Sequence, residues 1–141
     1  MSHDTNRPQF PGTRLRRLRS SAGIRDMVQE TRLTASDFIW PLFVVEGDKV
    51  EEPITSLPGV SRYSIDMIIE QARYALRLGI PAIALFPRTP DALKDARGTE
   101  ALNPNNLICR AVRAVKAECP DILLLCDVAL DPYTDHGHDG L

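Results

Sequence analysis

The chain of 141 residues contains no apolar run that approaches the about 20 residues needed to cross a membrane. Its N-terminal stretch, MSHDTNRPQFPG, also lacks the apolar centre of a secretory signal. With 43% hydrophobic and 26% charged residues, the composition is that of an ordinary soluble globular protein. The sequence therefore predicts a cytoplasmic protein that has no membrane partner.

The sequence is equally poor in the motifs of common binding folds. Its three cysteines, Cys109, Cys119 and Cys126, form neither a CxxC pair nor the spacing of a zinc finger, so we expect buried free thiols. No GxGxxG or Walker pattern is present, and the usual phosphate-binding loops therefore gain no support.

Positive charge is concentrated near the start of the chain. Residues 1–36 hold seven arginines against three acidic residues, a balance of +4, which leaves −6 for the remainder. A basic arm ahead of an acidic body is compatible with nucleic-acid binding, but arginines interleaved with Leu15 and Leu18 suit a protein surface. We therefore predict that residues 1–32 form an arm that docks on a neighbouring subunit, without a nucleic-acid partner.

Apolar runs predict three strands, at 38–45, 82–86 and 122–127, separated by two helices. The order β-α-β-α-β with continuous apolar strands is typical of a parallel sheet covered by helices. Pro41 lacks a backbone N–H, which suggests that the first strand lies at an edge of the sheet or enters it irregularly. The polar segment 87–103 is expected to be a mobile loop.

The helix boundaries are predicted from capping residues. The first helix should follow Ser64 and end at Gly79. The second should begin at Asn103-Pro104, which has the pattern of a cap followed by a first-turn proline.

Three strands fit either half of a doubly wound sheet or the opening of a (β/α)8 barrel, and neither would be complete at residue 141. We expect unpaired edges at strands 38–45 and 122–127, and wet apolar faces. The chain alone is then expected to be aggregation-prone or molten unless a partner completes the sheet.

The stretch DVALDPYTDHGHDG at 127–140 carries the chemistry. Asp127 directly follows a strand that we expect to be buried, so a desolvated carboxyl with a raised pKa suited to proton transfer is predicted there. The alternative is an aspartate that only caps a turn.

The same stretch is a candidate cation site. Its oxygen-rich donors suit Mg²⁺ better than Zn²⁺, and the two histidines, one residue apart, should point in different directions in an extended backbone. The candidate residues are Asp131, Asp135, His136, His138 and Asp139.

Several blocks of the sequence resemble the N-terminal part of porphobilinogen synthase, also called δ-aminolevulinic acid dehydratase. They are TRLRRLR at 13–19, LTASDFIWPLFVVEG at 33–47, ITSLPGVSRYSID at 54–66, LGIPAIALFP at 78–87 and, above all, CDVALDPYTDHGHDG at 126–140. The resemblance implies an α/β fold with an N-terminal arm (1–32) and the first β-α-β-α-β portion of a (β/α)8 TIM barrel (33–141), incomplete in this chain. It also implies a homo-oligomer, commonly an octamer, in which the arm wraps a partner subunit.

The family condenses two 5-aminolevulinate molecules into porphobilinogen in tetrapyrrole synthesis, and Asp127 matches its aspartate that assists proton transfer. Zinc-dependent members place cysteines where this chain has Ala129, Asp131 and Asp139. The chain therefore resembles the aspartate-rich branch, for which Mg²⁺ or a monovalent cation is implied and zinc is not. Asp131 and Asp139 are the loop residues expected at the substrate or the ion.

The family also holds its substrates through Schiff bases to two lysines in later strands. The only lysines here are Lys49, Lys94 and Lys116, in polar loops and on an outer helix face, and none suits that role. We expect a fragment of the synthase that is inactive alone. The alternatives are a non-catalytic assembly module that docks on full-length subunits, and a small cation-binding protein.

Overall fold

The computed structural model describes residues 10–140, and the chain divides into two compact units, Met1–Leu33 and Thr34–Leu141. Within the described part of the first unit lie a 3₁₀ turn, η1 (Arg17–Arg19), and one short helix, α1 (Ala22–Met27). The Ser21 hydroxyl caps α1 by accepting the Ile24 N–H at 3.2 Å. No residue from 10 to 33 is buried, so the described part of this unit has no core of its own. Among the described residues, no helix is long and apolar enough to span a membrane.

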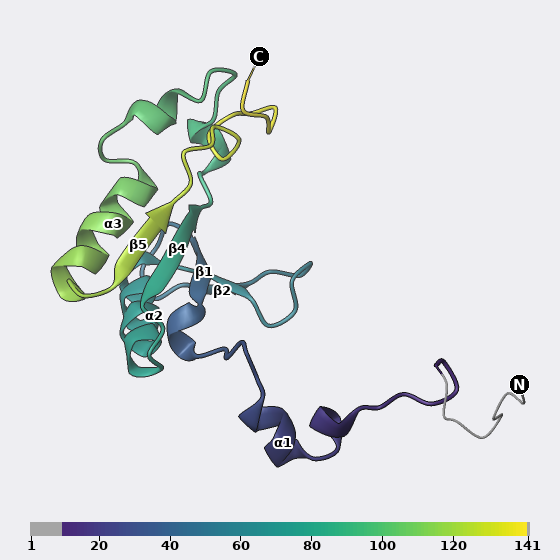
Figure 1. The fold of residues 1–141 in the computed structure, drawn as a ribbon. Helices are drawn as coiled ribbons and strands as arrows, with labels where there is room; N and C mark the ends of the chain where they lie inside the picture. The colour runs from purple at the N-terminus through teal and green to yellow at the C-terminus, as the bar shows by residue number, and fades with distance from the viewer. Residues whose placement is uncertain (1–9, 141) are drawn as a thin grey trace, which may run out of the picture. The chain divides into compact units, whose positions relative to one another are not determined.

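The second unit is a five-stranded sheet in the order β2-β3-β1-β4-β5, with two helices (Figure 1). Short 3₁₀ turns connect these elements, η2 (Ala35–Asp37) before the first strand and η3 (Asp91–Leu93) and η4 (Thr99–Leu102) after the fourth. The main elements are, in chain order, β1 (Ile39–Val44), β2 (Glu51–Pro53), β3 (Ser61–Tyr63), α2 (Ile65–Arg77), β4 (Ala82–Pro87), α3 (Leu107–Glu118) and β5 (Leu123–Cys126).

The predicted parallel arrangement is confirmed, because β1 pairs with β4 and β4 with β5, all parallel. Two strands were missed. The polar stretch between residues 45 and 64 forms an antiparallel pair, β2 and β3, and β3 adds to the free side of β1. These strands are three residues each and lack an apolar run, so the periodicity of the sequence gives no sign of them.

The expectation that the strand with Pro41 lies at an edge is wrong, because β1 is the central strand. The Val45 N–H donates to the Tyr63 carbonyl at 2.9 Å, so the odd-numbered residues of β1 direct their backbone groups toward β3. Since β3 pairs only with Phe43 and Val44, the missing N–H of Pro41 faces a side where β1 has no neighbour. The strand accommodates proline by being an edge over part of its length.

The helices pack on one face of the sheet and form the core with it. α2 follows Ser64 as predicted, although the Ser64 hydroxyl accepts the Val50 N–H at 2.8 Å instead of capping the helix. The predicted start of the second helix is wrong. Asn106 caps α3 by accepting the Cys109 N–H at 2.9 Å, whereas Asn103 closes a turn by accepting the Asn105 N–H.

The two faces of the sheet are covered unequally. The face toward α2 and α3 contains fully buried residues of β1 and β4, among them Val44, Ile83 and Leu85. On the opposite face, here called the open face, Leu123 is 59% and Leu125 is 42% exposed. The expectation of wet apolar faces is therefore confirmed at β5, whereas the expectations of a buried third strand and of a buried Cys126 are wrong. The continuous apolar run shows that a strand forms but not whether both of its faces are covered.

Candidate functional site

Asp127 lies at the carboxyl end of β5, where chemistry in parallel α/β proteins is usually found. Side chains alternate along a strand, so Leu123 and Leu125 point to the open face, and the alternation continued by one step places Asp127 there too. The register pairs Cys126 with Leu85, which puts Asp127 level with Phe86 on β4. The rings of Phe86 and Phe43 lie 5.8 Å apart between their centroids. Asp127 therefore stands at the end of an apolar surface.

The expectation that Asp127 is desolvated is wrong for this chain. Its side chain is exposed, and its only hydrogen bond among the described residues is one in which Oδ1 accepts the Ala129 N–H at 3.3 Å. The cause is the open face itself, since β5 is the edge strand of the sheet in the described part of the chain and no further strand there excludes water from the carboxyl. The carboxylate is thus accessible from that side.

The residues after Asp127 form a closed loop, here called the acidic loop (127–140). Asp139 closes it, because its Oδ1 accepts the N–H groups of Leu130 at 2.7 Å and of Asp131 at 3.1 Å. The buried Thr134 hydroxyl donates to the His138 carbonyl at 2.9 Å from inside the loop. The structure therefore brings Asp131 and Asp139 together where the loop closes. There, one carboxylate oxygen of Asp139 accepts hydrogen bonds from two backbone amides.

The two histidines of the acidic loop do not point apart as expected. Gly137 has a φ of +73°, and the turn that it makes brings the rings of His136 and His138 to 5.9 Å between centroids, at an interplanar angle of 21°. The His138 N–H donates to Nδ1 of His136, and Nε2 of His136 lies 3.1 Å from the Ala96 carbonyl oxygen. Together these contacts require the neutral Nε2–H tautomer of His136. The expectation assumed an extended backbone, which Gly137 prevents.

The acidic loop lies beside the connection between β4 and α3, here called the β4 loop (88–106; Figure 1). Asp95 and Thr134 form a parallel bridge between the two loops. Sequence reasoning missed this contribution, since it treated residues 87–103 as a mobile connection, whereas they contain η3, η4 and the buried Thr89. The signal available in the sequence was Gly98. Its φ is +63°, a backbone conformation that glycine adopts without the strain that a side chain would add.

The acidic loop contains carboxylate oxygens and the nitrogens of two histidines. Among residues 10–140, no three His, Cys, Asp or Glu side chains converge as a metal-binding group. Carboxylate oxygens are ligands that Mg²⁺ prefers, whereas zinc favours nitrogen and sulfur. The contact between Asp131 and Asp139 is made by the Asp131 backbone N–H, so the Asp131 carboxylate takes no part in it. Asp135 is exposed, and its side chain makes no hydrogen bond within the described residues.

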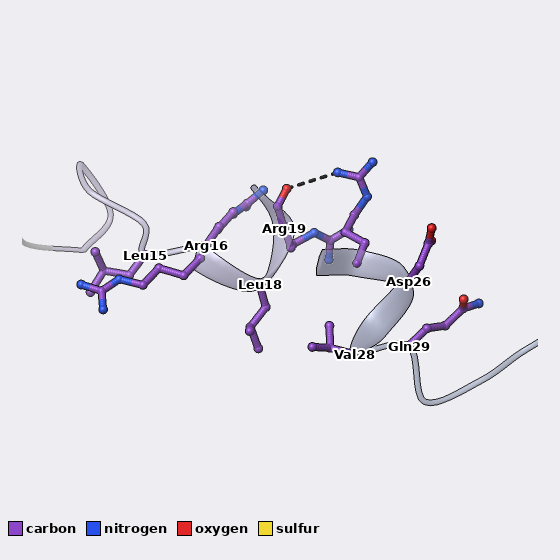
Figure 2. A pocket seen from close by; sticks show the side chains of 9 residues that line it. Leu15, Arg16, Leu18, Arg19, Asp26, Val28 and Gln29 are labelled. Carbon is purple, nitrogen blue, oxygen red and sulfur yellow. Dashed lines mark hydrogen bonds between the residues drawn. The ribbon is translucent and has the colours of Figure 1, made fainter. Parts of the chain in front are cut away.

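Two of the pockets in the structure bear on the location of the candidate site. One of about 220 Å³ lies between the β4 loop and the acidic loop and is lined by six residues, Ala96, Arg97, Leu130, Thr134, Asp139 and Gly140. A larger one, of about 900 Å³, lies in the N-terminal unit between η1 and α1 and contains none of the predicted site residues (Figure 2). Its walls are exposed side chains such as Leu18, Arg19 and Val28, so it is a gap between two short turns without a core. The smaller pocket is the one that belongs to the site.

Comparisons with known proteins show which family the chain is similar to. The model of the family described as delta-aminolevulinic acid dehydratase matches residues 12–141. A delta-aminolevulinic acid dehydratase of Bradyrhizobium diazoefficiens is 56% identical over 128 residues, which are 91% of this chain and 36% of that protein. One of Chlamydia pneumoniae is 45% identical over 91% of this chain and 39% of its own length.

A solved structure is similar as well. The delta-aminolevulinic acid dehydratase of Toxoplasma gondii, in complex with the reaction product porphobilinogen, superposes with a TM-score of 0.86 at 43% identity. The superposition covers 92% of this chain and 36% of that one. The chain thus spans little more than a third of the length of the relatives that it matches.

Proposed function

The chain belongs to the delta-aminolevulinic acid dehydratase family, and from this premise we propose that it supplies the first part of a porphobilinogen synthase. That enzyme condenses two 5-aminolevulinate molecules, with loss of water, in tetrapyrrole synthesis, and we place it in the cytoplasm. The fold is the corresponding portion of a (β/α)8 barrel, in which β1, β4 and β5 are three parallel strands.

The observation that carries the proposal is the position of Asp127. It ends the parallel strand β5 on the open face, which becomes the interior of a barrel once further strands close the sheet. There the carboxylate would be shielded from water and positioned for the proton transfers that the condensation requires. Asp127 is the acid–base group in this proposal.

The chain alone should not catalyse the reaction. A lysine that forms a Schiff base needs surroundings that favour its neutral amine. Lys49 and Lys116 are exposed, and Lys94 forms an ion pair with the carboxylate of Asp91 at 3.6 Å, so none of the three lies in an apolar pocket. None of the three lies on a strand of the sheet. The activated electrophile must therefore come from residues outside these 141.

A chimera tests the proposal without any assumption about residues beyond position 141. The aligned 128 residues would replace the matching segment of the Bradyrhizobium diazoefficiens relative, and porphobilinogen formation from 5-aminolevulinate would be measured. We expect turnover by the chimera and none by the chain alone. A folded chimera without activity, or porphobilinogen formation by residues 1–141 alone, would contradict the proposal.

For the ion, we propose Mg²⁺ or a monovalent cation with Asp131 and Asp139 as oxygen ligands, and not zinc. Such an ion would supply positive charge near the substrate, while the chain contributes the carboxylates that hold it. In the chelated chimera, readdition of Mg²⁺ should restore activity, or activity should persist without metal. Recovery with zinc only, together with one bound zinc per chain, would overturn this assignment.

For the partner, we propose a homo-oligomer, of octamer size, assembled through the N-terminal arm. The arm exposes apolar side chains without a core of its own, including Leu15 at 79% and Met27 at 85%, and burial on a partner would remove them from water. The same observation favours the second candidate function, an assembly module that docks on full-length subunits. Light scattering of the chimera with and without residues 1–33 tests the arm, since its removal should reduce the oligomer.

A further inference from the structure

We propose that Asp95 is a positioning residue that fixes the acidic loop over the carboxyl ends of β4 and β5. It acts through the backbone of Tyr133 to Asp135 and does not itself touch the substrate. The expected effect of Asp95 on catalysis rests on the proposed function. Its effect on the position of the acidic loop can be tested without an activity assay.

The first observation is the bridge between the two loops. The Asp95 N–H donates to the Tyr133 carbonyl at 3.3 Å, and the Asp95 carbonyl accepts the Asp135 N–H at 3.2 Å. One residue thus uses both of its backbone groups on the acidic loop, as in a parallel sheet. Thr134, which lies between these two contacts, is buried, as is Tyr133, whose phenol pKa is raised by burial.

The second observation is how the Asp95 side chain holds its own backbone in place for this bridge. Its Oδ1 accepts the N–H of Arg97 at 2.9 Å and the N–H of Thr99 at 3.0 Å. These two bonds fold residues 95–99 into a tight turn, and hydrogen bonds to the carboxylate hold the pKa of Asp95 below its usual value. Without the carboxylate, two amides at the start of η4 lose their acceptor.

The third observation is that the folded turn meets the acidic loop at two further points. A Cβ at Gly98 would lie 3.5 Å from Thr134 Cγ2 and 3.6 Å from Leu130 Cδ2, so the backbone there is in close contact with the acidic loop. The ring of His136 reaches the Ala96 carbonyl. Residues 95–98 therefore contact and support residues 130–136. The carboxylate of Asp95 determines the conformation of this supporting turn.

The effect of Asp95 on the site depends on the other contacts of the acidic loop. Asp139 and Thr134 close the loop upon itself, but these bonds do not fix its place above the sheet. Val128, at the start of the acidic loop, is 94% exposed and gives little support. If the turn at Asp95 opens, Asp131 and Asp139 shift relative to Asp127, and a displacement of about 1 Å can lower a rate by about 10²-fold.

The experiment compares three variants in the full chain and in the chimera. Asp95→Ala removes the acceptor, Asp95→Asn keeps an oxygen that can accept both amides, and Asp91→Ala is the matched control. Asp91 lies in the same loop, and within the described residues its carboxylate forms a single ion pair, with Lys94 at 3.6 Å. Hydrogen–deuterium exchange of peptides from residues 127–140 and from β4 is followed in each.

We expect Asp95→Ala to speed exchange in residues 127–140 by about tenfold or more and to leave β4 unchanged, since the bridge lies outside the sheet. Asp95→Asn and Asp91→Ala should stay within about twofold of the parent. Unchanged exchange in Asp95→Ala, or equal effects of Asp95→Ala and Asp91→Ala, overturns the proposal. If Asp95→Ala also speeds exchange throughout β4, the residue supports the whole fold, and the positioning role is likewise refuted.

The kinetic arm uses the chimera. We expect kcat of Asp95→Ala to fall by about tenfold or more with a smaller change in KM, and Asp95→Asn to restore most of it. A chimera that is inactive before any substitution would defeat the proposed function, whereas the exchange experiment would still decide the role of Asp95. If exchange in residues 127–140 is faster in Asp95→Ala but kcat is normal, the position of the loop does not limit the reaction, and the role of Asp95 in catalysis is refuted.

Discussion

The two faces of the sheet are built from similar apolar residues but have different surroundings. On the helix-covered face, Ile83 and Leu85 are fully buried against α2 and α3. On the open face, Leu123 and Leu125 of the adjacent strand remain half exposed, and Asp127 follows them. The covered face holds the unit together, whereas the open face presents the carboxylate to whatever completes the sheet. Stability and chemistry are therefore divided between the faces of one sheet.

The largest expected effect is on the covered face. Leu85→Ala should lower the free energy of unfolding of the chain by about 2–5 kcal/mol, because it leaves a cavity between the sheet and the helices. Leu125→Ala on the open face should lower it by about 0.5 kcal/mol or less. Urea denaturation at low protein concentration, followed by circular dichroism, measures both. Equal losses would mean that the open face is packed in solution.

The second effect concerns association through the open face. The pair Leu123→Lys and Leu125→Lys should reduce self-association and the binding of a hydrophobic dye, since it places charge on an exposed apolar surface and on the unpaired edge strand β5. Leu102→Lys is the matched control, because Leu102 is 85% exposed but lies outside the sheet. Sedimentation and dye fluorescence provide the measurements. A similar benefit from Leu102→Lys would point to general solubility instead of the open face.

The smallest effect is acid opening of the β4 loop. Hydrogen bonds from Thr99 and Arg97 hold the pKa of Asp95 below its ordinary 3.8. The carboxylate therefore stabilises the folded loop fully above that value, and its contribution is lost as the pH falls through the lower folded pKa. The amide signals of Arg97 and Thr99 should shift in that range when followed by NMR from about pH 6 to pH 2. The transition should be absent in Asp95→Asn, and its persistence there would assign it to another group.

Much of the covered face could be predicted from the sequence. The stripes of α2 and α3 and the apolar runs of β1, β4 and β5 follow from periodicity, and the parallel order is confirmed. The short strands β2 and β3 could not be found in this way, because their pairing depends on the free side of β1 and not on their own composition.

The geometry of the candidate site could be predicted only in part. The dense carboxylates and histidines at 127–140 lie in one closed loop, in which the Asp131 N–H donates to the Asp139 carboxylate, but their role in binding or catalysis stays a prediction. The exposure of Asp127 was missed because burial depends on which elements cover a face, which local sequence does not encode. Asp95 was missed because its role arises from a contact between loops about 40 residues apart, as the bond between His136 and Ala96 illustrates.

The most direct test of the account uses the two ends of β5 in the chimera. Asp127 ends the strand at its carboxyl side, whereas Asp121 is an exposed aspartate in the turn before the strand. We predict that Asp127→Ala lowers kcat for porphobilinogen formation by about 10²-fold or more, as loss of a positioned acid–base group does, while Asp121→Ala stays within about twofold. Near-normal turnover in Asp127→Ala, or equal losses in both variants, would contradict the assignment of chemistry to the open face.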